Sequence, residues 1–575
     1  MENSENIKLD NRLNLFLSMT NSEKKIASHM MDGYEPLQKT WRLIVKYSGD
    51  IRKVAKAFNA DTDILNDKYA IVSIREPYIK DFALYNEVEY IESPRKIDLS
   101  LMNSMREACV TQVNDFPQYN LKGGGVLIAV IDSGIDYNNS DFKNADGTSR
   151  IHYIWDQSIS GVPPKGYAYG TEYTRNNIND AIAANSTSER LSIVPHEDYS
   201  GHGTHVSGIA AGNGIYRGVA PQASLLIVKL GSPDYEGYPI NTIDIMFAVK
   251  YAIEKARELN MPLAINFSYG STIGSHDGNS LFESYMDDIS LNYRTSIVAA
   301  MGNECMRARH TSGNVMRNSE VEFVVCNDVK SISLDVWISN MNYFDLEVIN
   351  PNGVSSGSVR AFSTNYRYRI GAEQLIIMFH PATPYNAKGN ISIEIFSEFG
   401  LLCEGIWRLD FYPSNSLANS YDIWMQAPGF LQTCRFVNPT LENTITIPAT
   451  VRRIISVSGY NHSTGKISSF SGRGDINGAY LKPDLTAPCE NILSTAVNGG
   501  YTNMSGTSMA APFVTGAAAL IMEWGIVRGH DRYLYGEKLK SLLCLGAKRD
   551  KNTIYPNNVW GNGTLCLIKT MEKLI

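Results

Sequence analysis

Two features that direct a protein out of the cytosol are missing from this chain. The N-terminus, MENSENIKLDNRLNLFL, has no basic stretch followed by a long apolar run, so we expect no secretory signal. No run approaches the roughly 18 to 20 apolar residues that a membrane-spanning helix needs, which predicts no membrane span. Together these absences predict a cytoplasmic protein.

Cysteine is sparse and shows no pattern. The eight cysteines are scattered over 575 residues with no CxxC pair. In a reducing compartment such cysteines behave as small buried residues. Because the secretory signal is missing, we expect free thiols and no disulfide framework.

Strong charge of either sign is also absent. The net charge is -7 and charged residues make up 19% of the chain, so nothing indicates a nucleic-acid-binding surface. Hydrophobic residues make up 43%, which is enough to build cores and excludes a disordered chain. The length predicts two or three domains. Nothing in the sequence indicates the oligomeric state.

Residues 1–100 predict a small α/β domain. Strand-like and helical segments alternate there, at 40–50 (strand), 51–60 (helix), 68–76 (strand), 81–88 (helix) and 88–93 (strand). This order favours an open-faced sandwich of helices on a sheet. The domain is too short to hold a deep site of its own.

From about residue 121 the pattern changes to buried parallel strands. Continuous apolar runs occur at 123–132, 223–230, 262–268, 295–302 and 452–460. Such runs are typical of strands that are buried on both faces of a parallel sheet. The apolar residues of 243–259 recur at helical spacing, and the alternation predicts a doubly wound α/β domain with a mostly parallel sheet.

Between residues 313 and 440 the helical patterns disappear. Short alternating segments are separated by turns such as NPNG and PSNS, which predicts an all-β sandwich inserted into the α/β domain. The predicted organisation is therefore an N-terminal domain (1–100), the α/β domain in two parts (101–312 and 441–575) and the insertion (313–440).

Three polar residues lie where an α/β sheet places its ligands. Asp132 ends the apolar run 126–132, and open α/β sheets bind ligands at the carboxyl ends of their strands. Taken alone, an Asp at that position is often only a helix cap.

The segment GHGTHVSGIAAG (201–212) predicts a helix that packs closely on the sheet, because its many small residues allow backbones to approach. His202 lies at the start of this helix, while His205 would point into the core one turn later. We assign His205 a structural role. Metal binding by the two histidines lacks a third ligand nearby.

The segment NMSGTSMAAPFVTGAAALI (503–521) is the strongest signal. Ser508 follows a Gly-Thr turn at the start of an Ala/Gly-rich helix, where backbone N–H groups and the helix dipole favour a developing anion. A lone Ser at a helix start would be read as a cap, but the whole segment is hard to explain in that way.

Taken together, these segments resemble the signature blocks of subtilisin-like serine proteases. The blocks DSG, HGTHVSG and GTSMAAP carry Asp132, His202 and Ser508, and they occur in the family's order. AAMGNE (299–304), NFSYG (266–270) and the C-terminal YPNNVWGNGTLCL also match. The resemblance spans about 121–312 and 441–570, and it implies a serine endopeptidase with this catalytic triad.

The resemblance also implies the oxyanion donor and the substrate-binding residues. Asn303 matches the side chain that donates a hydrogen bond to the oxyanion. The walls of the pocket for the residue before the scissile bond would be formed by Ser268, Tyr269 and Gly270 together with Ala300 and Gly302. Glu304 could attract a basic residue there or simply be solvated.

No cofactor is required by this chemistry. Asp141 matches a position that binds calcium in many members of the family. The segment AAGNGIYRGVAP (210–221) is too short to contain the loop that supplies the other ligands, so calcium stays unassigned and no metal site is predicted.

The layout most resembles the Csp germination proteases of clostridia, which have a propeptide without a signal and a jelly-roll insertion. The resemblance implies that residues 1–100 are a propeptide that acts as chaperone and inhibitor, is cut by the enzyme itself within about 96–106, and stays bound. It further implies association with spores and activation of a cortex-lytic zymogen.

Several alternatives remain open. The sandwich is either a brace for the protease or a module that binds carbohydrate or protein. A pseudoprotease that serves as a scaffold or germinant sensor is the main competing function, although such relatives lose triad residues that are present here. An esterase-like hydrolase would need a GxSxG motif, and Ser508 lies in SGTSMA instead.

Overall fold

The structure is a computed structural model. It describes residues 7–20, 23–24, 33–36, 38–94, 98–99, 108–231, 240–292, 294–315, 319–327, 329–338, 344–360, 365–398, 400–413, 419–426, 434–476, 478 and 480–574. Contacts divide the chain into two compact units, of which the first comprises Met1–Arg95, Thr272–Phe282 and Met306–Asn443. The second comprises Lys96–Ser271, Glu283–Cys305 and Thr444–Ile575.

The N-terminal domain (residues 7–94) belongs to the first unit and is the α/β domain expected from the sequence. Its sheet has the order β1-β2-β4-β3, with β5 paired to β2. The elements are α1 (Asn11–Ser18), β1 (Tyr34–Glu35), β2 (Thr40–Tyr47), α3 (Ile51–Ala57), β3 (Asp61–Ile64), β4 (Tyr69–Arg75), α4 (Ile79–Ala83) and β5 (Val88–Glu92). The strands expected at 40–50, 68–76 and 88–93 and the helix at 51–60 are confirmed, whereas the helix expected at 81–88 lies at Ile79–Ala83 and β3 was not expected.

The inserted sandwich (residues 310–436) consists of two antiparallel sheets, as its alternating pattern predicts. The larger sheet has the order β14-β22-β16-β20-β19-β18 and the smaller β17-β21-β15-β23. The strands are β14 (His310–Val315), β15 (Ser319–Val325), β16 (Ser331–Ile338), β17 (Phe344–Ile349), β18 (Asn365–Ile370), β19 (Glu373–His380), β20 (Gly389–Ser397), β21 (Gly405–Pro413), β22 (Asn419–Gln426) and β23 (Arg435–Phe436).

The larger sheet of the sandwich buries apolar side chains on both faces. Leu375 and Ile377 of β19 belong to the core between the two sheets. Ile376 and Met378, which alternate with them, belong instead to the core of the N-terminal domain, together with Phe396 of β20. Because successive side chains of a strand point to opposite faces, the N-terminal domain and the sandwich share one hydrophobic core through this sheet.

The α/β domain, in the second unit, contains the expected buried sheet. Its strand order is β25-β24-β13-β11-β7-β10-β8-β9, with β26 beside β24. The six strands from β24 to β8 run parallel. The strands are β7 (Leu127–Asp132), β8 (Ile151–Asp156), β9 (Thr171–Thr174), β10 (Ser224–Lys229), β11 (Leu263–Phe267), β13 (Thr295–Ala300), β24 (Ile455–Asn461), β25 (Lys466–Ile467) and β26 (Leu485–Pro488). The predicted fold class is confirmed.

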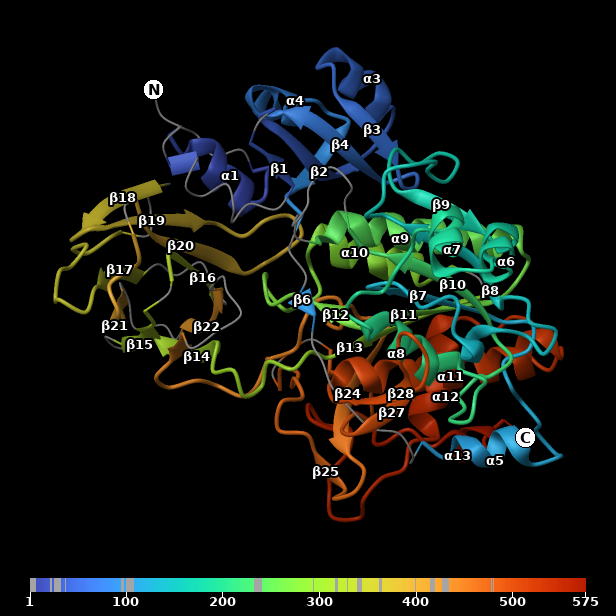
Figure 1. Cartoon of the computed structure of the whole chain (residues 1–575). Helices are drawn as coiled ribbons and strands as arrows, with labels where there is room; N and C mark the ends of the chain where they lie inside the picture. Colours follow the sequence, from blue (N-terminus) through green and yellow to red (C-terminus); the bar gives the residue numbers. More distant parts are fainter. Residues whose placement is uncertain are drawn as a thin grey trace. The chain divides into compact units, whose positions relative to one another are not determined.

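Helices cover both faces of this sheet, with α9 on one side and α8 and α11 on the other (Figure 1). The helices are α5 (Val110–Asp115), α6 (Arg175–Ile182), α7 (Thr187–Ile193), α8 (His202–Ala211), α9 (Thr242–Glu258), α10 (Leu281–Ile289), α11 (Thr507–Met522), α12 (Gly536–Leu545) and α13 (Leu567–Met571). Small residues let α8 and α11 pack closely, since a Cβ on Gly516 would lie 3.0 Å from the carbonyl oxygen of Ala210.

The segment Thr507–Val527, which contains α11, is long and apolar enough to cross a membrane, with a mean hydropathy of 1.5. The expectation that no run of this length occurs is therefore corrected for this segment. The same segment is 89% buried inside the protein, as expected for the central helix of an α/β core.

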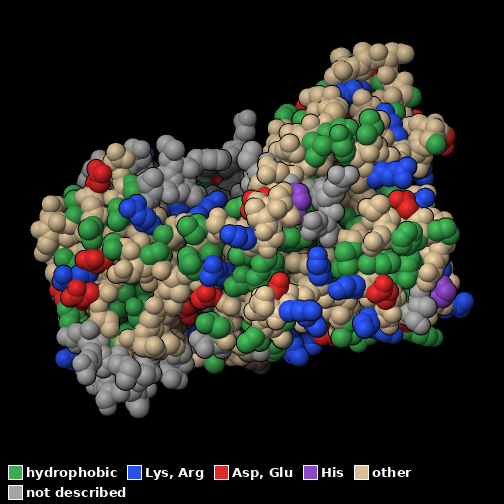
Figure 2. Space-filling view, turned by 90° about the horizontal axis from the view of Figure 1, so that it is seen from below, with side chains coloured by type: hydrophobic (Ala, Val, Ile, Leu, Met, Phe, Trp, Pro, Cys, Tyr) green, Lys and Arg blue, Asp and Glu red, His purple; other side chains and the backbone are tan. Residues whose placement is uncertain are grey.

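One face of the molecule mixes charges of both signs. Figure 2 shows one face of the molecule, on which Lys and Arg side chains are interspersed with Asp, Glu and apolar side chains. A mixture of this kind produces no strong long-range field on that face.

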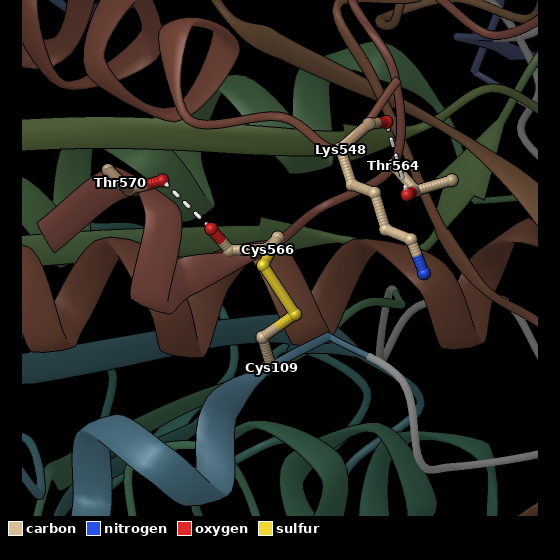
Figure 3. Close-up of a disulfide and its surroundings, with 5 residues drawn as sticks. All are labelled: Cys109, Lys548, Thr564, Cys566 and Thr570. Atoms are coloured by element: carbon tan, nitrogen blue, oxygen red, sulfur yellow. Dashed lines mark hydrogen bonds between the residues drawn. A yellow bond between two sulfur atoms is a disulfide. The ribbon is translucent and has the colours of Figure 1, made fainter. Parts of the chain in front are cut away.

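The expectation that all cysteines are free thiols is wrong. Cys109, just before α5, forms a disulfide with Cys566, just before α13, across a sequence separation of 457 residues (Figure 3). A pairing between residues this distant in sequence cannot be recognised from their spacing. The six other cysteines, all within the described part of the chain, remain thiols.

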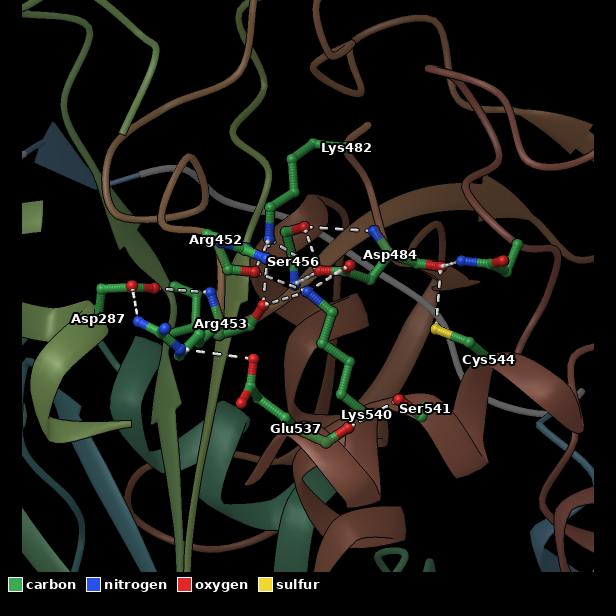
Figure 4. A network of polar contacts seen from close by, with 12 residues as sticks. Asp287, Arg452, Arg453, Ser456, Lys482, Asp484, Glu537, Lys540, Ser541 and Cys544 are labelled. Carbon is green, nitrogen blue, oxygen red and sulfur yellow. Dashed lines mark hydrogen bonds and ion pairs between the residues drawn. The ribbon is translucent and has the colours of Figure 1, made fainter. Parts of the chain in front are cut away.

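A buried ion-pair network fastens the strands β24 and β26 to α12 (Figure 4). Asp484 pairs with Lys482 at 2.9 Å and with Lys540 at 2.6 Å. It also accepts hydrogen bonds from the backbone N–H and the hydroxyl of Ser456. Burial opposes ionisation of Asp484, but the two ammonium groups outweigh it and lower the pKa of this carboxyl to about 2.

We expect Asp484→Asn to lower the free energy of unfolding by about 3 to 5 kcal/mol, because it leaves a buried ammonium group without its partner. A carboxyl with a depressed pKa stabilises the fold above its ordinary pKa of 3.8 and loses this contribution as the pH falls further. The difference between variant and wild type, measured by urea unfolding, should therefore shrink below pH 4.

The control is Glu537→Gln, which removes a partially exposed carboxylate 3.4 Å from Arg453 in the same network. Exposed ion pairs contribute little, so this variant should stay within about 0.5 kcal/mol of wild type. Equal losses for the two variants would contradict the role given to Asp484.

Candidate active site

Asp132 and His202 form a buried hydrogen-bonded pair. Asp132 ends β7, which lies between β10 and β11 in the sheet, and His202 begins α8. Asp132 Oδ1 lies 2.7 Å from His202 Nδ1, and both side chains are fully buried. Since an ionised carboxylate only accepts hydrogen bonds, it fixes the proton on Nδ1 and makes Nε2 the basic nitrogen.

A second carboxylate, Asp198, holds this pair in place and was missed from the sequence. Its Oδ1 accepts hydrogen bonds from the Ser133 hydroxyl at 2.8 Å and the Gly201 N–H at 3.0 Å. Its Oδ2 accepts from the N–H and the hydroxyl of Thr204 at 2.8 and 2.7 Å. Asp198 thereby caps α8 and connects it to the residue after Asp132. A carboxylate four residues before the histidine was the available signal.

The two other buried histidines nearby cannot act as the base. His205 Nε2 contacts the carbonyl oxygens of Ile492 and Thr502, and burial lowers the pKa of His205 to about 4, in keeping with its predicted structural role. His196 Nδ1 pairs with Asp156 at 2.6 Å, and its Nε2 accepts the Ile135 N–H.

Ser508 is the second residue of α11 and contacts the segment next to β12 (Tyr269–Gly270). Its hydroxyl donates to the Ser268 carbonyl oxygen at 3.0 Å, and the Ser268 hydroxyl donates to the Ser508 carbonyl oxygen at 2.9 Å. The next residue, Tyr269, packs its ring edge-on against the His202 imidazole, with centroids 6.0 Å apart. Adjacent residues therefore contact the serine and the histidine.

The Tyr269 side chain is buried, although its backbone belongs to the strand expected to bind substrate. Burial, and then the carboxylates of Asp132 and Asp198, raise the pKa of Tyr269 well above its ordinary value. The phenol therefore stays neutral beside the histidine.

Asn303 lies beside the start of α11, just after β13. Its side-chain oxygen accepts hydrogen bonds from the N–H and the hydroxyl of Thr507, at 2.9 and 3.2 Å. The Thr507 hydroxyl in turn accepts the Gly302 N–H at 3.0 Å. Because Thr507 contacts the oxygen, an oxyanion beside Ser508 would accept a hydrogen bond from the amino end of this amide. Thr507 was not identified from the sequence.

A strand of the chain itself pairs with the expected substrate-binding strand. In the two-residue strand β6 (Asp98–Leu99), Leu99 pairs with Tyr269 and Asp98 with Gly270 in antiparallel register. Of the expected cleavage region 96–106, only these two residues lie within the described part of the chain.

The other expected pocket residues lie nearby. Ala300 is the buried last residue of β13, and Gly302 adopts a positive φ of 90°. Glu304 is half-buried.

The residues around Asp141 do not fit a calcium site. Its carboxylate accepts hydrogen bonds from the hydroxyls of Thr495 and Tyr501, at 2.8 and 3.1 Å. The buried guanidinium of Arg150 donates to the carbonyl oxygens of Asp141 and Ala211, so a side-chain cation already occupies this neighbourhood. Among the described residues, no group of three His, Cys, Asp or Glu side chains could hold a metal ion.

Comparisons with known proteins agree with this geometry. The profile of the Csp protease B prodomain matches residues 7–95. The CspB protease of Clostridium perfringens has a solved structure that is similar with a TM-score of 0.75 and 37% identity, over 81% of this chain and 96% of that one.

More distant relatives share the protease part. The PI-type proteinase of Lactococcus lactis subsp. cremoris is 24% identical over 76% of this chain, which spans only 25% of that proteinase. A subtilisin from Bacillus sp. (strain TA39) is 31% identical over 43% of this chain and 49% of its own length. The profile of the subtilase family matches residues 123–326 and 425–563, which is more than half of the chain. The chain belongs to the subtilase family.

Proposed function

We propose that this chain is a serine endopeptidase in which Ser508 is the nucleophile, His202 the general base and Asp132 the residue that orients and stabilises the imidazole. The 2.7 Å pairing of Asp132 with His202 is the observation that carries this proposal. This pairing orients the basic nitrogen of His202. Tyr269 contacts the His202 imidazole, and the adjacent Ser268 accepts a hydrogen bond from the Ser508 hydroxyl.

The reaction follows from these positions. The Ser508 hydroxyl attacks the scissile carbonyl while His202 Nε2 accepts its proton and later donates it to the leaving amine. The Asn303 amide and the Ser508 backbone N–H stabilise the oxyanion. An acyl-enzyme on Ser508 forms and is hydrolysed by water.

The first substrate is the chain's own N-terminal segment. Leu99 pairs with Tyr269, and the carbonyl oxygen of the preceding Ser268 contacts the Ser508 hydroxyl. We infer that during cleavage the residue after Leu99 in the sequence is the one whose carbonyl is attacked. The chain would therefore be cut between Ser100 and Leu101, inside the range expected from the sequence.

After the cut, the N-terminal domain would stay bound as a retained propeptide. Ile376, Met378 and Phe396 of the sandwich lie in its hydrophobic core, and about 1.5 to 3 kcal/mol favours the burial of each such side chain. None of the described residues of this core lies between 95 and 107, so cleavage there would not cut through it.

The resemblance to Csp proteases supports a physiological role in spore germination, through activation of a cortex-lytic zymogen. We place the protein in the cytoplasm of the sporulating cell, in association with the spore.

Autoprocessing tests the catalytic assignment. Intact mass should show wild type as two fragments separated after residue 100, whereas Ser508→Ala stays whole. Asn303→Ala should process about a hundredfold more slowly, since one oxyanion donor contributes about 3 kcal/mol.

Ser505→Ala, three residues before the nucleophile in the same turn, is the matched control and should process like wild type. A wild-type chain that stays whole, or a Ser508→Ala chain that is cut, would refute the proposed chemistry.

Retention of the N-terminal fragment after cleavage can be tested by size-exclusion chromatography of the processed protein. The two wild-type fragments should co-elute, whereas the double variant Ile376→Asn, Met378→Asn should release the N-terminal fragment, because polar groups would enter the shared core. Ile406→Asn, at a side chain that is 53% exposed on the other sheet, should retain it. Co-elution in all three proteins would show that the shared core does not hold the fragment.

A further inference from the structure

Two glycines beside the nucleophile face a single threonine. A Cβ on Gly270 of β12 would lie 2.7 Å from Thr446 Cβ, and one on Gly302 would lie 2.7 Å from Thr446 Oγ1. Side chains cannot approach this closely, so the Thr446 side chain takes the space that larger residues at either position would need. Thr446 was not singled out from the sequence, because it lies far from every motif.

Thr446 lies in a segment that bridges the two walls of the expected substrate pocket. Its N–H donates to the Met301 carbonyl oxygen at 2.9 Å. The next residue, Ile447, exchanges two backbone hydrogen bonds of 2.9 Å with Ser271. One wall contains Gly302 and the other Gly270, and Thr446 is therefore held between them by backbone hydrogen bonds on both sides.

The hydroxyl of Thr446 is buried without a partner. The residue is 4% exposed, and among the described residues no group forms a hydrogen bond with Oγ1. A buried hydroxyl left unpaired is unfavourable, and a ligand hydroxyl beside it would supply the missing hydrogen bond.

This closed space lies next to the reacting atoms. Gly270 follows Ser268 by two residues, and the Ser268 carbonyl oxygen contacts the Ser508 hydroxyl. On the other wall, the Gly302 N–H donates to Thr507, the residue before Ser508. The side chain of the residue whose carbonyl is attacked would enter between these walls.

We propose that Thr446 closes the pocket for the residue before the scissile bond, so that the enzyme cuts after small residues and prefers serine, whose hydroxyl pairs with Thr446 Oγ1. This inference rests on the proposed peptidase function. It narrows the substrate class to chains with serine, alanine or glycine at that position. Serine is also the residue at position 100, before the proposed cut.

The test uses the chain's own processing, so no other substrate is needed. Intact mass and the time course of cleavage are measured for wild type, Ser100→Ala and Ser100→Phe. We expect Ser100→Ala to be cut about tenfold more slowly, from loss of one hydrogen bond. Ser100→Phe should be slowed a hundredfold or more after residue 100, because the ring does not fit, or be cut at a neighbouring small residue.

Variants of Thr446 distinguish the effect of the pocket's shape on the cleavage rate from the effect of the Thr446 hydroxyl. Thr446→Gly, which opens the pocket, should restore cleavage after the introduced phenylalanine in the Ser100→Phe chain. Thr446→Val keeps the shape without the hydroxyl. In the Thr446→Val background, the Ser100→Ala change should therefore no longer slow the cut.

The outcomes distinguish this inference from the proposed function. If the wild-type chain is not cut at all, the peptidase function fails. A wild-type cut after a large or charged residue, or cleavage of the Ser100→Phe chain after its phenylalanine at the wild-type rate, overturns the assignment of Thr446 while leaving the triad in place. The position-100 comparisons decide this even if Thr446→Gly does not fold.

Discussion

The close contact between α8 and α11 is the constraint on which the site depends. Each helix carries one residue of the proposed triad in its first turn, His202 on α8 and Ser508 on α11. Gly516 lets the two backbones approach beside Ala210. A larger residue there would meet Val219 and the Ala210 carbonyl oxygen and displace this part of the core, and a displacement of about 1 Å at reacting groups can cost a hundredfold in rate. The small residues of these helices are therefore a requirement of the chemistry as much as of the packing.

Local patterns were enough to predict the fold and to single out the residues of the candidate site. The buried strands β7, β10, β11, β13 and β24 are continuous apolar runs, and short runs of this kind are typical of strands covered on both faces. Asp132, His202, Ser508 and Asn303 stand in dense motifs at strand or helix ends. In these cases the information lies within a dozen consecutive residues.

What could not be predicted depends on contacts between distant residues. Asp198 resembles any loop carboxylate until its five hydrogen bonds are seen. Thr446 follows the inserted sandwich by several residues, and only the folded chain brings it against Gly302. The disulfide joins the two ends of the α/β domain. It was not expected because the missing secretory signal predicted a reducing compartment, in which disulfides are rare.

The sandwich was weighed as a brace or as a ligand-binding module, and one of its faces now has an occupant. Ile376, Met378 and Phe396 turn one face of the larger sheet toward the N-terminal domain. The opposite face packs within the sandwich itself. The N-terminal domain thus packs against the inserted sandwich. The apolar surface that it covers belongs to the sandwich and not to the α/β domain.

The disulfide between Cys109 and Cys566 changes how the protease would respond to force. It closes nearly the whole α/β domain, with the insertion inside it, into one covalent ring. A cut upstream of Cys109 leaves only a short free tail outside this ring. A pull on that tail reaches Cys109, where the disulfide links it directly to Cys566 beside α13, so a machine that unfolds proteins from the N-terminus would have to translocate a closed loop or reduce the bond first.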